Sequence, residues 1–130
     1  MTRDDWLELT VLEKKKYNHL VEIQDVTRQL AEGLDRNDQV SVRMLVAMRH
    51  DPIRLLAEVD NSGKMRMATM PEEDRKRIRE VTGGAEPQDD GERVFQEHAS
   101  KTRRLLEQVV RLDQRVSVRM AGDNSFYHSK

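Results

Sequence analysis

The chain has 130 residues, a length that suits one domain, and it is polar, with 36% charged and only 4% aromatic residues. Its 23 lysines and arginines balance 24 aspartates and glutamates, so neither nucleic acid nor an anionic membrane is expected as the partner. The lack of cysteine excludes disulfides, thiolate metal sites and a cysteine nucleophile. No stretch approaches the roughly 18 apolar residues of a membrane span, so we expect no membrane insertion and a cytoplasmic location.

Glycine and proline divide the chain into four long segments, which predict four helices. The first helix is expected at about residues 4–34, with Thr2 as its N-cap. Its apolar residues recur every three or four positions, as they do on one face of a helix. They are Leu9, Leu12, Leu20, Ile23, Leu30 and Leu34, with Lys16 and Thr27 at the intervening positions of the stripe.

The second helix is expected at about residues 38–60, ended by the turn-forming residues 61–63. Pro52 falls in its middle. Because proline lacks a backbone donor and clashes with the preceding turn, we expect a kink or break near residues 48–51.

The third helix is expected at about residues 70–82 and is short. Thr69-Met-Pro-Glu72 matches the pattern of a capping box, and Gly83-Gly84 ends the helix. Its few apolar residues predict a position on the surface of the bundle.

The fourth helix is expected at about residues 90–120 and carries the clearest heptad pattern. The stripe consists of Phe95, His98, Thr102, Leu105, Val109, Leu112 and Val116. Residues 121–130 are interpreted as a flexible tail. The whole predicts one all-α domain over residues 1–120, an elongated antiparallel, coiled-coil-like bundle of two long N-terminal helices, a short third helix and a long C-terminal helix.

No pattern brings together catalytic groups or ligands for a metal or cofactor. None of the four histidines belongs to a Glu-x-x-His pair, and HExxH, P-loop and GxGxxG sequences are absent. We therefore expect a protein that is not an enzyme and needs no cofactor. One alternative stays open, because His98-Ala-Ser-Lys101 resembles the His-x-x-Lys of histidine phosphotransfer domains, in which the histidine carries the phosphoryl group. Thr102 stands where those domains have a small residue, and His98 shares the apolar stripe.

Apolar residues outside the stripes are candidates for a partner-binding surface. Met65 and Met67 belong to a methionine-rich segment, which suits a surface that accepts more than one packing; the alternative is that they plug one end of the bundle. Val116 and Val118 cannot share one helix face. Phe126-Tyr127 in the tail has no obvious core to enter and is a candidate binding segment.

The first two predicted helices resemble a known family over about residues 6–60. The resemblance is carried by Leu9, Leu12-Glu13-Lys14, Tyr17, Leu20-Val21, Ile23, Gln29-Leu30, Asp38, Leu45, Arg49, Ile53 and Val59-Asp60. This pattern is similar to that of flagellar export chaperones of the FlgN type, with the FliT type as a close cousin. Pro52 departs from the family pattern, as does the methionine-rich segment at residues 64–70.

The resemblance implies a chaperone that binds hook-associated or filament-cap proteins in the cytoplasm, prevents their premature assembly and delivers them to the flagellar export apparatus. By analogy with the family, the cargo contact lies on the outer face of the fourth helix and on the tail. The residues placed there are Leu106, Val110, Val118, Met120, Phe126 and Tyr127. An amphipathic cargo helix would add to the bundle as an extra helix. A further alternative is a structural coiled coil that associates with itself, for example as a homodimer.

Overall fold

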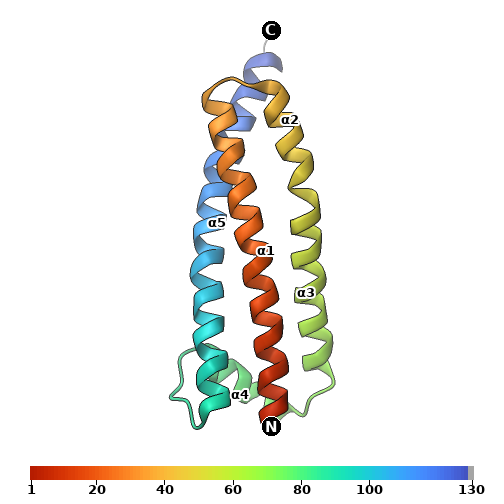
Figure 1. The fold of residues 1–130 in the computed structure, drawn as a ribbon, viewed down its shortest axis with the longest axis vertical. Helices are drawn as coiled ribbons and strands as arrows, with labels where there is room; N and C mark the ends of the chain where they lie inside the picture. The colour runs from red at the N-terminus through yellow and green to blue at the C-terminus, as the bar shows by residue number, and fades with distance from the viewer. Residues whose placement is uncertain (129–130) are drawn as a thin grey trace.

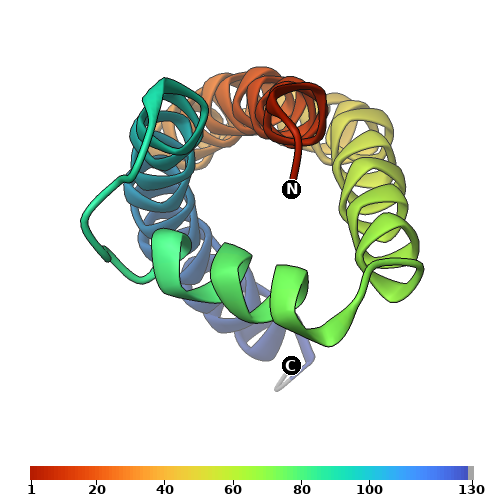
Figure 2. The ribbon, with the colours of Figure 1, turned by 90° about the horizontal axis from the view of Figure 1, so that it is seen from below.

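The computed structural model describes the backbone of residues 1–128 and the side chains of residues 1–122. The described residues form helices and no strand: α1 (Arg3–Asp35), α2 (Gln39–Met48), α3 (His50–Ala68), α4 (Glu72–Thr82) and α5 (Asp90–His128). The helices α1, α5 and the α2–α3 pair run along the length of the molecule, and α1 lies between the two others (Figure 1). Seen from below, they follow an arc, and α4 lies across its remaining side at this end (Figure 2).

The direction of the helices differs from a simple antiparallel bundle. The chain ascends in α1, descends through α2 and α3, and ascends again in α5 after α4 has carried it across the lower end (Figure 1). The α1–α3 pair is therefore antiparallel, as expected. The α1–α5 pair is parallel, because the chain reverses direction twice between them, once between α1 and α2 and once through α4.

The core is a column of three buried clusters between α1 and its neighbours. The lower cluster contains Trp6, Leu9, Ile78, Val81, Phe95 and Ala99. The middle cluster contains Leu20, Ile23, Leu105 and Val109. The upper cluster contains Leu30, Leu34, Leu45 and Val116. The stripes predicted for the first and last helices therefore face each other, which confirms that these helices are amphipathic and form the spine of the fold.

Thr2 caps α1 as predicted, because its hydroxyl accepts a hydrogen bond from the backbone N–H of Asp5 and the Asp5 carboxylate accepts one from the backbone N–H of Thr2. These hydrogen bonds lower the pKa of Asp5. Asp38 caps α2 in a similar way through Ser41, which lowers the pKa of Asp38. Both carboxylates also lie at the positive end of a helix dipole.

The second predicted helix is broken at Arg49, where α2 ends and α3 begins, three residues before the buried Pro52. The break therefore lies where the missing donor of proline predicts it. The predicted end at residues 61–63 is wrong, because α3 continues through Gly63 to Ala68. The cost of glycine in a helix is outweighed by packing, since Met67 reaches the lower core cluster beyond it.

Replacing Gly63 by alanine should stabilise the protein. A Cβ atom there would lie 3.9 Å from Leu12 Cδ1, which is an ordinary contact, and alanine removes the entropic penalty of glycine. We expect the free energy of unfolding to rise by about 0.5–1 kcal/mol, measured by urea denaturation. Gly84→Ala is the opposite control and should be destabilising, because Gly84 has a φ of 104°. A Gly63→Ala protein less stable than the parent would contradict the helical assignment.

The helix α4 ends at Thr82, before Gly83, as predicted, but it differs from its prediction at its start and in its burial. Thr69 does not form a capping box: its hydroxyl donates to Arg66 O at the end of α3, and Pro71 is the N-cap without a side-chain hydrogen bond. The surface position is also wrong, because Ile78 and Val81 are buried in the lower cluster. Two apolar residues of α4 are enough to bury this helix, because Trp6, Leu9 and Phe95 of α1 and α5 supply most of the cluster.

Two polar anchors join α4 to α5. The carboxylate of Glu92 is 3% exposed and pairs with Arg77, and this contact raises the pKa of the Arg77 guanidinium. The Nε2 of Gln96 donates to the carbonyls of Val81, in the last turn of α4, and Ala85, just after the helix. These contacts hold α4 across the lower end of the bundle.

The last helix is longer than predicted. It continues from Asp90 to His128, past the expected end at Met120 and through most of the segment assigned to a tail, residues 121–130. None of the helices formed by the described residues is long and apolar enough to cross a membrane.

Candidate partner-binding surface

Helices α3 and α5 lie on opposite flanks of α1 (Figures 1 and 2). At the upper end, Arg49 of the α2–α3 junction pairs with Asp113 of α5. At the lower end, α4 closes the fourth side of the bundle. The side of the bundle between these two closures has no helix of its own among the described residues.

Exposed apolar side chains face this open side. On α5, Leu106 and Val110 are 43% and 44% exposed, and on α3, Ile53 is 44% exposed. Leu106 and Val110 lie between Arg103 and Asp113 at a spacing of three, four and three residues, so all four share one face of α5. Asp113 contacts the α2–α3 junction, so this face is directed toward α3.

The matching face of α3 is defined in the same way. Ile53 lies between Arg49, which pairs with Asp113, and Leu56, which packs against the middle core cluster. We name the residues Ile53, Leu56, Leu106 and Val110 the apolar strip. It runs along the open side with two residues on each wall.

A cavity of about 430 Å³ continues the strip toward the lower end of the bundle, and residues of α4 form part of its lining. Its apolar wall comes from Leu9, Leu12, Met67, Ile78 and Phe95, and its charged rim includes Asp60, Lys64, Arg79 and Arg103. Such a combination of apolar wall and charged rim suits a helix with one apolar and one charged face.

The wall formed by α3 is attached to the bundle by partly buried apolar contacts, which include those of Leu56 and Met67, and by ion pairs with α1. Among the described residues of α3, only Pro52 is buried. Near its lower end, Arg66 pairs with Glu8 and Asp5 of α1, and Lys16 of α1 lies 3.5 Å from the Asp60 carboxylate. Partly exposed ion pairs of this kind contribute little to stability each.

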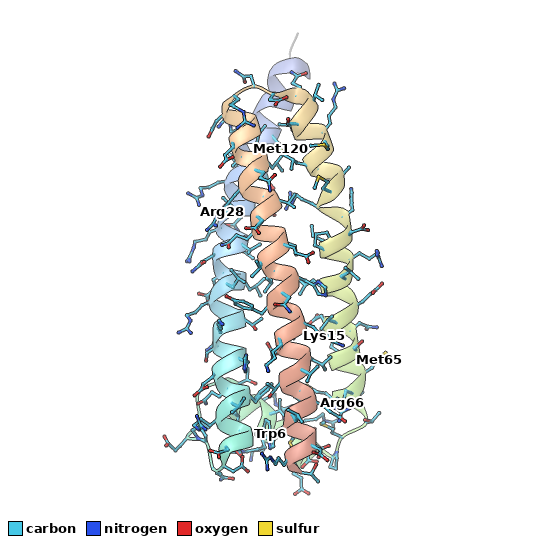
Figure 3. The ribbon with its side chains drawn as sticks, viewed as in Figure 1. Trp6, Lys15, Arg28, Met65, Arg66 and Met120 are labelled. Atoms are coloured by element: carbon cyan, nitrogen blue, oxygen red, sulfur yellow. The ribbon has the colours of Figure 1, made fainter. Side chains whose placement is uncertain are left out.

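The structure separates the residues predicted to bind a partner. Leu106 and Val110 belong to the apolar strip, and Met67 lines the adjoining cavity and packs on the lower core. Met65 is 65% exposed on the outer side of α3, away from the strip (Figure 3). The two interpretations of the methionine-rich segment therefore each hold for one residue. Met67 packs at one end of the bundle, whereas Met65 is exposed.

The remaining predicted residues lie nearer the C-terminus. Val118 is 73% exposed but lines a different groove, between α5 and α1. Met120 is half-buried and packs on the upper core cluster. The side chains of Phe126 and Tyr127 lie outside the part of the chain whose side chains the structure describes.

His98 is half-buried on the core side of α5. Its imidazole makes no hydrogen bond with the described residues. Its neighbour on the stripe, Thr102, is buried and lies 3.3 Å from the carbonyl of Glu13 across the α1–α5 interface. Within residues 1–122, no group of three or more His, Asp and Glu side chains is arranged to hold a metal ion.

Sequence reasoning missed Ile53 as a surface residue. The sequence does indicate its position, because Arg49, Ile53 and Leu56 are spaced by four and three residues and therefore lie on one face of a helix. The pattern alone does not reveal that no helix covers this face.

Comparison of the chain with models of known protein families, with curated proteins and with solved structures finds no match.

Proposed function

We propose that the protein is a cytoplasmic chaperone of flagellar export. In this proposal it is not an enzyme; it binds hook-associated or filament-cap proteins before secretion and passes them to the export apparatus. Two features support the proposal: the resemblance of residues 6–60 to chaperones of the FlgN type, and a helical bundle with an uncovered apolar face. The observation that carries it is the apolar strip.

A cargo segment would bind as an amphipathic helix along the strip. Apolar side chains at positions i, i+3, i+4 and i+7 of the cargo would contact Ile53, Leu106 and Val110, and charged residues would meet the rim of the cavity. Burial of the exposed part of each strip residue contributes on the order of 1 kcal/mol.

The test is the affinity of the full chain for C-terminal segments of hook-associated and filament-cap proteins from the same organism, measured by titration calorimetry. The double variant Leu106→Glu and Val110→Glu should lose about thirtyfold in affinity, or roughly 2 kcal/mol, because it places two carboxylates against the apolar cargo face. Both residues are more than two-fifths exposed, so the fold should persist.

Val40→Glu is the matched control, because Val40 is 79% exposed on α2 and lies outside the strip. It should bind cargo as the parent chain does. Equal affinities for all three proteins would place cargo binding elsewhere, and no binding to any cargo by the parent chain would refute the chaperone proposal.

A further inference from the structure

A second surface lies between α1 and α5, separate from the apolar strip. It is a groove of about 860 Å³ that runs along the upper half of the two helices. Gln24 of α1 and Gln108 of α5 lie 3.5 Å apart there. Leu112 and Val118 provide apolar surface in the groove, and Arg28, Arg111 and Arg115 provide charge.

The charge of this groove is of one sign. No aspartate or glutamate belongs to its lining. Within residues 1–122, none of the three arginine side chains makes an ion pair or hydrogen bond, and Arg28 projects on the α1–α5 side of the bundle (Figure 3). Ion pairs are formed by the arginines at positions 49, 54, 66, 75, 77, 79, 93 and 119, whereas Arg3, Arg36, Arg43, Arg103 and Arg104 resemble the groove arginines in forming none within residues 1–122.

Two further features distinguish the groove from an ordinary solvated helix face. Arg111 and Arg115 lie one turn apart on α5, and like charges at this spacing destabilise a helix. Val118 follows at the next turn and is 73% exposed, so a large apolar side chain ends the row of guanidinium groups. A ligand that fits must therefore offer carboxylates and an apolar side chain on the same face.

We propose that this groove binds an acidic amphipathic helix of a partner protein. Glutamate or aspartate side chains of that helix would pair with Arg28, Arg111 and Arg115, and an apolar residue would cover Val118. Arginine suits this task, because its planar guanidinium binds carboxylates through two hydrogen bonds. The partner is distinct from the cargo of the proposed function, because Leu106 and Val110 face α3 whereas the groove faces the α1 side of α5.

The proposal is tested with a labelled synthetic helix about four turns long, with glutamate on one face and leucine at its end, and with a twin that has lysine for every glutamate. Fluorescence anisotropy gives the affinity of each probe for the full chain. The groove variant Arg28→Gln, Arg111→Gln and Arg115→Gln should bind the acidic probe at least tenfold more weakly than the parent. The variant Arg3→Gln, Arg36→Gln and Arg43→Gln has the same change in net charge outside the groove and should bind within about twofold of the parent.

A charge-reversed variant gives a positive readout. The variant Arg28→Glu, Arg111→Glu and Arg115→Glu should bind the lysine probe more tightly than the parent does. Equal loss in the groove variant and its control would mean that only net charge attracts the probe, and would overturn the proposal. So would tighter, groove-dependent binding of a labelled oligonucleotide, or a dimer that becomes monomeric in the groove variant. The cargo titration with Leu106→Glu and Val110→Glu is independent of all these results.

Discussion

Replacing Trp6 by alanine should cost about 3–5 kcal/mol of folding free energy. Trp6 is 2% exposed, and its ring centroid lies 5.3 Å from that of Phe95 in the lower cluster. Its loss leaves a cavity where α1, α4 and α5 meet, and the cluster closes poorly because Ile78 and Val81 are held by the short α4. The measurement is urea denaturation followed by far-UV circular dichroism, since the variant has lost the single tryptophan.

Trp6→Phe is the control for this substitution. It keeps an aromatic ring against Phe95 and should cost clearly less than the alanine variant. An alanine variant that lost under about 1 kcal/mol would show that Trp6 is not part of a packed core.

Replacing Leu30 by alanine should cost about 2–5 kcal/mol. Leu30 is fully buried in the upper cluster, at the opposite end of the molecule from Trp6. Because the three clusters form one column along the same two helices, we expect one cooperative transition rather than separate melting of the upper end. Trp6 fluorescence and far-UV circular dichroism should therefore give the same shifted midpoint.

Leu7→Ala provides a matched control in the same helix, because Leu7 is 58% exposed. It should change the free energy of unfolding by no more than about 0.5 kcal/mol. Equal losses for Leu7→Ala and Leu30→Ala would contradict the packing of α1. Two different midpoints for the Leu30 variant would show that the upper cluster unfolds on its own.

The parts of the fold that could be predicted from sequence are those set by local periodicity. The stripe of α1, the heptads of α5, the cap at Thr2 and the break before Pro52 each depend on residues within a few turns of one another. Buried Leu20 and Val109 follow directly from such spacing.

The parts that could not be predicted depend on segments that meet only in the folded chain. Gly63 is a local signal for a helix end, but the packing of Met67 on the lower core overrides it. Val81 lies in a sequence too polar to suggest burial, yet Trp6 and Phe95 enclose it.

The same distinction applies to the candidate sites. Leu106 and Val110 could be identified from the sequence as candidate binding residues, because they are apolar but lie beside the heptad positions that pack in the core. Arg28 could not be connected with Arg111, because the register of α1 against α5 brings them to one groove. A surface that combines distant helices has no signature in either helix alone.

The pairing of the first helix with the last has a consequence for the synthesis of the chain. The Thr102 hydroxyl approaches the carbonyl of Glu13, 89 positions away, and Arg119 donates to the carbonyl of Leu34, 85 positions away. Contacts this distant close large loops and slow folding, because the chain loses entropy before it gains them. A nascent chain interrupted before α5 presents the apolar face of α1 to the cell, where proteases and aggregation act on it. That face of α1 therefore stays open to proteases and aggregation until α5 has been synthesised and has packed on it.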